Sequence, residues 1–411
     1  MILTQIPKES PMLHSTRPCF FLLLVSLFLG GPAASGRAAT VDELEQRLDA
    51  LAAELATART PAAPRVSLGG YGEVHYNNLR GERDNGASAP ADQIDLHRFV
   101  LFAGYRFSDT LSLRSEVEVE HALAAPADDD PGEVAIEQAY VEWVGRAWLG
   151  VRGGLLLVPA GILNETHEPP TFFGVERNRV ESQIIPTTWR EAGVQLFGEL
   201  SSAVAYQVGL HSGLALAPGS DARGGLRGSR QQGAEATAER LALSATVRVA
   251  PRAGLGGGLS FVYQDDLTQG AGAPVAALLS EAHLQYRSGP WEGRVLYARW
   301  DVDGADDFFA DRGGQIAETQ QGGYVEAAYH LARLLPEGHD LAPFVRYERF
   351  DTNATVPAGV ARDPSRDERV TTAGLNYWPT PQVVVKVDVQ ELHNQAGSGA
   401  DRWNVGVGWW F

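Results

Sequence analysis

The longest segment without a strand pattern, residues 159–188, carries a mixed set of ionisable side chains. Its charged members are Glu165, His167, Glu168, Glu176, Arg177, Arg179 and Glu181. Apolar residues such as Phe172, Phe173, Ile184 and Ile185 lie among them, so the segment has apolar surface to pack against a neighbour. Segments of this length without secondary structure of their own are usually functional or disordered. Because arginine is always ionised and suits contacts with carboxylate or phosphate groups, we expect this segment to meet charged solutes or to be held by ion pairs.

Two other patterns suggest catalysis or metal binding at first sight. His211 and Ser212 resemble part of a hydrolase site, but adjacent residues on a strand point to opposite faces and do not pair as nucleophile and base. The acidic run 301–307 resembles the start of a calcium loop, but Arg312 stands where the distal glutamate is needed. We therefore expect no enzymatic activity, no bound metal and no cofactor.

The composition indicates an exported protein that does not bind nucleic acid. The chain has 411 residues and a formal net charge of −17, whereas nucleic-acid partners require basic patches. Its only cysteine, Cys19, begins an apolar run that ends at Leu29, after basic residues and before a stretch of small residues. This layout is typical of a secretory signal peptide, which we assign to residues 1–39. After residue 30 no apolar run approaches the roughly 20 residues of a membrane-spanning helix.

Residues 40–60 are predicted to form a short coiled-coil helix, followed by a proline-containing linker at 61–65. Its apolar residues are spaced alternately by three and four positions, and they are Val41, Leu44, Leu48, Leu51 and Leu55. A helix of under three heptads is marginal alone, so another part of the chain must bring copies together. The alternative is a single amphipathic helix that packs on the rim of the domain that follows.

The last eleven residues predict a strand with one apolar face. Trp403, Val405, Val407, Trp409 and Phe411 fall on that face, whereas polar residues and glycines occupy the other. Such a strand fits a transmembrane β-barrel, with the apolar face toward lipid and the aromatic residues at the interface. Trp409 and Phe411 also resemble the C-terminal signature of bacterial outer-membrane barrels, so we expect them to be the signal read by the barrel-assembly machinery.

From Val66 to the end, the chain is predicted to be all-β, with sixteen strands. The predicted spans are 66–79, 94–107, 110–121, 134–144, 147–158, 189–200, 202–212, 238–249, 253–264, 276–288, 290–301, 320–333, 340–351, 368–378, 381–391 and 401–411. Short turns alternate with long polar loops between them, as in outer-membrane barrels. We therefore predict a sixteen-stranded antiparallel transmembrane β-barrel over 66–411, with the coiled-coil helix on the periplasmic side because the strand number is even.

Parts of the sequence also resemble a known family, the trimeric sixteen-stranded porins typified by the phosphate-selective porins O and P. The similarity lies in Gly69-Gly70-Tyr71-Gly72-Glu73, in Ile94 to Phe102 and, most specifically, in GILNETHEPPTFFGVERNRVESQIIPTTWREAGVQLFG at 161–198. The resemblance covers essentially all of 66–411 and implies a homotrimer of barrels with the third loop, 159–188, folded inward as a constriction. One departure is that Lys386 is the only lysine after the leader, and the predicted lumen mixes arginine with glutamate, which argues against phosphate specificity.

Selectivity is expected to depend on charged side chains at the narrowest point of the pore, because low-dielectric walls focus the field there. The predicted basic residues are Arg177, Arg179, Arg190, Arg98, Arg114 and Arg152. The predicted acidic residues are Glu176, Glu181, Glu116 and Glu118. This set predicts a weak anion preference carried by Arg177 and Arg179. The alternative is that both arginines pair with these glutamates and hold the loop in place.

Together these features predict a water-filled channel for small anionic or neutral solutes in the outer membrane of a Gram-negative bacterium. The expected partners are two further copies of the chain, the lipid bilayer and lipopolysaccharide. The alternative function is a structural barrel with a plugged lumen, tethered through its periplasmic coiled coil.

Overall fold

The computed structural model describes residues 65–79, 82–89, 92–122 and 132–411. The predicted signal peptide, coiled-coil helix and linker, including Val41, Leu44, Leu48, Leu51 and Leu55, lie outside the described residues. Among the described helices, none has the length and apolar character required to cross a membrane.

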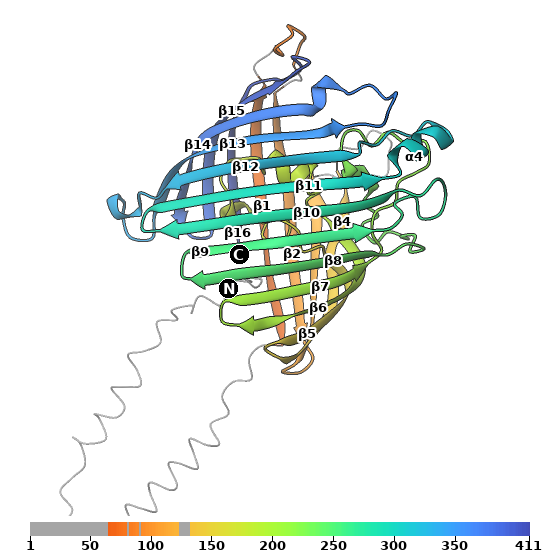
Figure 1. Ribbon diagram of the computed structural model, residues 1–411. Helices are drawn as coiled ribbons and strands as arrows, with labels where there is room; N and C mark the ends of the chain where they lie inside the picture. Colours follow the sequence, from red (N-terminus) through yellow and green to blue (C-terminus); the bar gives the residue numbers. More distant parts are fainter. Residues whose placement is uncertain (1–64, 80–81, 90–91, 123–131) are drawn as a thin grey trace, which may run out of the picture. The chain divides into compact units, whose positions relative to one another are not determined.

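Sixteen strands form one closed antiparallel barrel, as predicted (Figure 1). In chain order they are β1 (Val66–Leu79), β2 (Gln93–Arg106), β3 (Leu111–Glu120), β4 (Val134–Arg146), β5 (Leu149–Leu157), β6 (Arg190–Ser201), β7 (Val204–His211), β8 (Ala242–Arg252), β9 (Leu255–Gln264), β10 (Ala276–Ser288), β11 (Trp291–Asp303), β12 (Thr319–Tyr329), β13 (Asp340–Thr355), β14 (Asp367–Thr380), β15 (Val383–Asn394) and β16 (Arg402–Trp410). Each strand pairs with its sequence neighbours, and β1 pairs with β16. The predicted fold class is therefore confirmed for the barrel.

The last strand closes the barrel. Phe411 and Gly70 exchange two backbone hydrogen bonds, of 3.0 and 2.9 Å, next to the β1–β16 ladder. On β16, Trp403 and Val407 are each 38% exposed on the outer face, whereas Asn404 on the inner face is fully buried. This alternation of an apolar outer face with a polar inner face agrees with the pattern of a strand between lipid and lumen.

The connections at the two ends of the barrel differ. One end has tight turns and the short 3-10 helix η3 (Ala332–Leu334). The other end has the long loops, which contain η1 (Pro169–Thr171), α3 (Arg179–Gln183), η2 (Leu226–Ser229), α4 (Ala305–Arg312) and η4 (Pro364–Arg366). Figure 1 shows α4 among these loops at the end of the barrel opposite the η3 turn.

Two β-bulges bring extra side chains to the inner face. Glu73 pairs with Arg98 and Val74 pairs with Leu96, so His97 is the additional residue on β2. Glu116 of β3 pairs with Gln138 of β4, and Val117 of β3 pairs with Ile136 of β4. Glu137 is therefore the additional residue on β4. Because a bulge inserts one residue into the alternation, His97 and Glu137 face the lumen next to Arg98 and Gln138.

Candidate functional site

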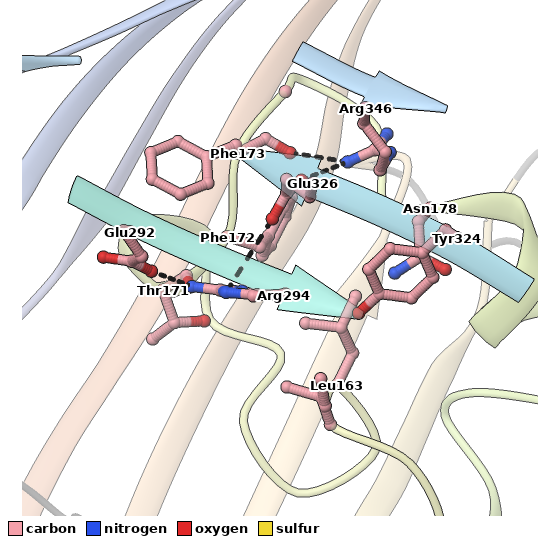
Figure 2. A network of polar contacts seen from close by, with 12 residues as sticks. Leu163, Thr171, Phe172, Phe173, Asn178, Glu292, Arg294, Tyr324, Glu326 and Arg346 are labelled. Atoms are coloured by element: carbon pink, nitrogen blue, oxygen red, sulfur yellow. Dashed lines mark hydrogen bonds and ion pairs between the residues drawn. The ribbon is translucent and has the colours of Figure 1, made fainter. Parts of the chain in front are cut away.

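The segment Pro159–Thr188, here called the inner loop, lies inside the barrel and is held by side chains of several wall strands. Arg294 of β11 donates a 2.8 Å hydrogen bond to the carbonyl of Thr171, and Arg346 of β13 donates one of 3.1 Å to the carbonyl of Phe173 (Figure 2). Backbone carbonyls inside a protein need hydrogen-bond partners. Because both bonds end on backbone carbonyls, they fix the path of the loop and do not depend on which side chains the loop carries at Thr171 and Phe173.

Arg346 is also the centre of an ion-pair group within the wall. It is 2% exposed and contacts Glu326 of β12 at 3.1 Å (Figure 2). It also contacts Glu348 of its own strand at 2.9 Å. The amine of Lys386 on β15 lies 3.5 Å from the centre of the Phe172 ring. Charged wall residues on β11–β15 are therefore engaged in holding the inner loop.

The short helix α3 binds the wall through its first backbone amides. The N–H groups of Arg179 and Val180 donate to one carboxylate oxygen of Glu348, at 2.6 and 3.2 Å. Glu181 is fully buried and accepts from the N–H groups of Ile162 and Leu163, at 2.7 and 2.6 Å. Glu181 was expected at the constriction, but the structure places it in the packing of the loop because its oxygens satisfy buried backbone donors.

A second anchor ties the start of the inner loop to β3 and β4. His167 is buried, with its Nε2 atom 3.7 Å from Glu116 and 3.4 Å from Glu137. Burial alone lowers the pKa of His167, but the two neighbouring carboxylates outweigh burial and raise that pKa to about 10. The imidazole is therefore a cation at neutral pH, and it links the loop to carboxylates of the wall. Arg190 adds a second positive charge 3.6 Å from Glu137.

Arg177 and Arg179, expected together at the constriction, have different partners. Arg179 forms a 2.7 Å ion pair with Glu368 on β14 and lies 5.3 Å from the centre of the Phe350 ring. Arg177 instead donates to the hydroxyl of Thr188 and the carbonyl of His167, both at 3.3 Å. Neither arginine pairs with Glu176, Glu181, Glu116 or Glu118 among the described residues. Arg179 anchors the loop, whereas Arg177 keeps a charge without a carboxylate ion pair in the described region.

Two basic residues that the sequence analysis missed reach the same place from the loop between β7 and β8. Arg227 donates to the carbonyl of Thr187, and Arg230 donates to the carbonyls of Pro186 and Thr188 at 3.1 and 2.5 Å. Burial, together with the positive charges of Arg227 and Arg190, lowers the pKa of Arg230 to about 9. The sequence signal was the group of arginines within 223–230, but this segment lies between predicted strands, so alternation does not indicate where its side chains point.

The expected wall arginines are largely neutralised by carboxylates. Arg98 lies 2.8 Å from Glu73 and 3.3 Å from Glu118. Arg152 lies 3.2 Å from Glu142, which Arg114 also approaches at 4.0 Å. Arg177, Arg227 and Arg230, here called the arginine cluster, form no ion pair with a carboxylate of the described residues and are therefore the stronger source of positive potential near the inner loop.

Comparison with solved structures shows that this barrel is similar in fold to those of outer-membrane channels. OmpF of Salmonella typhi, solved with daunomycin, is 14% identical, with a TM-score of 0.56 over 84% of this chain and 97% of that one. DcaP of Acinetobacter baumannii is 13% identical over the same two shares, with a TM-score of 0.54. The anion-selective porin from Comamonas acidovorans is 14% identical, with a TM-score of 0.53 over 84% and 99%. At these identities the likeness shows the fold.

Sequence comparison identifies a family member as well. A protein of Aquifex aeolicus (strain VF5), described as an uncharacterized protein, is 31% identical over 368 residues, which are 84% of this chain and 80% of that one. The chain belongs to the same family as this Aquifex protein. No family model matches the chain. The likeness to the phosphate-selective porins O and P stays a prediction.

Proposed function

We propose that the protein is an outer-membrane channel through which small hydrophilic solutes diffuse, with a weak preference for anions. The main support is that Arg177, Arg227 and Arg230 converge inside a sixteen-stranded barrel, and none of the three forms an ion pair with a carboxylate of the described residues. Fixed positive charge between low-dielectric walls raises the local concentration of anions. Net charge is a poorer guide, because carboxylates in surface loops beyond about 8 Å are screened at physiological salt.

Solvent exposure supports a path on the side of β1–β4. Asn77, Asp95, His97 and Glu120 are partly exposed there, as is Arg177 on the facing loop. Wall residues that contact the inner loop are buried on both sides, with exposures of 2% for Glu116 and 0% for Glu137 on β3 and β4, and of 2% for Arg346 and 0% for Glu348 on β13. We place the solute path between the inner loop and β1–β4, where the partly exposed side chains lie, with the arginine cluster beside it.

A structural barrel with a plugged lumen is the second candidate. It is favoured by the large apolar cluster in which Ile184 and Ile185 of the inner loop pack with Leu214, Leu267 and Phe308 from three other long loops. Such packing covers part of the barrel mouth. In this alternative the barrel would serve to tether a periplasmic partner through residues 40–60.

Single-channel recording separates the two candidates. The full-length protein, inserted into planar bilayers, should give steady conductance steps, and its reversal potential in a KCl gradient should indicate a modest anion preference. A barrel without steady current would reject the channel and favour the plugged alternative. A clear cation preference would reject the role given to the arginine cluster.

The assembly and location follow from the same proposal. We propose a homotrimer in a Gram-negative outer membrane, with the helix 40–60 in the periplasm, lipopolysaccharide around the outer face and Trp409 and Phe411 read by the assembly machinery. One solved neighbour of the same fold, OmpT of Vibrio cholerae, is described in a trimer form; it is 13% identical, with a TM-score of 0.52.

A further inference from the structure

Three histidines meet on the lumen side of β1–β3, close to the proposed solute path. His75 is on β1, His97 is the bulged residue of β2, and His121 directly follows β3. The His75 and His97 rings stack at 4.6 Å between centres, and the His97 and His121 rings are 5.6 Å apart. Simple alternation on β2 would place His97 and Arg98 on opposite faces, so the bulge is what brings His97 to the group.

Carboxylates surround these rings from the wall and from the inner loop. Glu176 of the inner loop lies 3.4 Å from Nδ1 of His75, and Glu73 lies 3.0 Å from Nε2 of the same ring. Asp95 lies 3.2 Å from Nδ1 of His97. Arg98 offsets only part of this negative charge, because it contacts Glu73 and Glu118 rather than Asp95 or Glu176.

The hydrogen bonding leaves one ring nitrogen of each of two histidines available. Nδ1 of His75 is buried and makes no well-aligned hydrogen bond among the described residues; its carboxylate neighbour is Glu176 at 3.4 Å, the other proposed ligand. For His97, Asp95 occupies Nδ1, which leaves Nε2. A histidine that binds a metal ion commonly uses one nitrogen for the metal and donates the other N–H to a carboxylate. Glu73 and Asp95 supply this second contact to His75 and His97 respectively.

We infer that His75, His97 and Glu176 form a binding site for a divalent transition-metal ion of the Zn²⁺ class. One ligand atom from each of the three residues lies within 4.8 Å of the others. Two imidazoles and one carboxylate suit Zn²⁺ and similar ions, whereas Mg²⁺ and Ca²⁺ prefer oxygen ligands. Coordination requires the His97 ring, 26% exposed and therefore the freer of the two, to turn out of its stacked position.

Two other histidine–carboxylate groups occur among the described residues: Asp95 with His97 and His121, which shares His97 with this site, and His167 with Glu116 and Glu137. The proposed site is better suited to an added cation than the group at His167. That group is buried and already contains the positive charge of Arg190 at 3.6 Å from Glu137. The site at His97 instead includes partly exposed side chains, so an ion can enter from the lumen. Since Glu176 belongs to the inner loop, a bound ion would join the loop to β1 and β2 and add positive charge beside the solute path.

Direct binding tests the site independently of transport. Full-length protein without a histidine tag, treated with chelator and kept in detergent, is titrated with Zn²⁺ alone by calorimetry, with Mg²⁺ as a comparison cation. We expect one tight Zn²⁺ site per chain, weakened at least tenfold in His97→Gln and in Glu176→Gln. His393→Gln is the matched control, because this exposed histidine pairs with Asp84 away from the site. Equal Zn²⁺ affinity in wild type and His97→Gln, or equal binding of Mg²⁺, would overturn the inference.

A second readout addresses geometry and transport separately. Co²⁺ bound to wild type should give visible absorption bands typical of nitrogen and oxygen ligands, and these bands should be lost in His97→Gln while heat-modifiable gel mobility shows an intact barrel. The effect on conductance rests on the proposed channel function: Zn²⁺ should reduce the current in wild type and not in His97→Gln. A protein that binds Zn²⁺ but never conducts would support the metal site and reject the channel. A protein that conducts but does not bind Zn²⁺ would support the channel and reject the metal site.

Discussion

Arg177 and Arg179 are two positions apart in the inner loop, yet only one of them has a carboxylate partner among the described residues. Arg179 is bound to Glu368 at 2.7 Å, whereas Arg177 donates to a hydroxyl and a carbonyl of the loop. We expect Arg177→Gln to move the reversal potential in a KCl gradient toward cation preference, because it removes an uncompensated charge beside the path. Arg179→Gln is the matched control and should change that potential much less. Equal shifts in both variants would contradict the separate roles.

The His167 anchor predicts a response to alkaline pH. Its pKa is raised to about 10 in the folded state, from an ordinary value of 6.5, by Glu116 and Glu137 acting against burial. The ionic contact therefore stabilises the loop fully below about pH 6.5 and is lost as the pH rises through about 10. We expect current noise from loop motion to increase above pH 10 in wild type. His167→Gln, which has no such titration, should show noise that is independent of pH; the same rise in both proteins would exclude the anchor as its cause.

Alternation along the strands was enough to predict the barrel but not all of its inner face. Arg98, Glu116, Glu118 and Arg152 were expected inside because each lies on the polar face of a strand, and they are inside. The bulge that turns Glu137 inward was not predicted, although it shifts the alternation by one residue between Ile136 and Val141, which both face outward. The contacts of Arg227 depend on how two loops distant in sequence fold against each other, and residue spacing does not encode that.

At the level of elements, Arg346 on β13 is the main link between the wall and the inner loop. It is 2% exposed, forms ion pairs with Glu326 and Glu348 and donates to the carbonyl of Phe173. Arg346→Met would leave the buried Glu348 without its cation, whereas Glu326 would keep Arg294 at 3.7 Å. Removing one partner of a buried ion pair typically costs about 3–5 kcal/mol. We expect faster proteolysis of the inner loop in this variant while heat-modifiable mobility of the barrel is kept.

The exposed pair Arg299 and Asp301 on β11 provides the control for that experiment. Their guanidinium and carboxylate groups are 2.7 Å apart, with exposures of 39% and 52%, and surface pairs contribute roughly 0–1 kcal/mol. Arg299→Met should therefore leave the proteolysis rate unchanged. If Arg346→Met is cleaved no faster than Arg299→Met, the inner loop does not depend on Arg346.

The closing strand β16 predicts a defect in assembly. Trp409 covers Gly72 so closely that a Cβ atom there would lie 2.6 Å from its ring, and Phe411 completes the backbone pairing with Gly70. Replacing Trp409 and Phe411 with serine should sharply reduce the folded barrel in the outer membrane, because the strand loses its interfacial aromatic residues. Heat-modifiable gel mobility is the measurement, and Trp148→Ser, an exposed aromatic on a β4–β5 turn, is the control. Normal amounts of folded double variant would refute the role of β16.

At the scale of the whole molecule, two sources of trimer stability are expected: contacts between barrels and the predicted helix 40–60. The helix has five apolar seam residues, and full burial of each contributes about 1.5–3 kcal/mol before entropy is subtracted. A helix of this length is marginal alone, so the barrels should bring the three copies together and the seam should reinforce them. The two contributions are therefore expected to be separable by deletion.

Removal of residues 40–60 should leave trimers that dissociate at a lower temperature than the wild-type trimer. Heating before gel electrophoresis measures this directly, since the trimer band disappears at the dissociation temperature. Leu48→Asp with Leu51→Asp should reproduce the deletion, because buried carboxylates oppose association at the seam. Glu45→Ala with Gln46→Ala changes residues off the seam and should leave the temperature unchanged. Unaltered melting of the deletion variant would instead assign the helix to the barrel rim or to a periplasmic tether, since neither role adds contacts between the three chains.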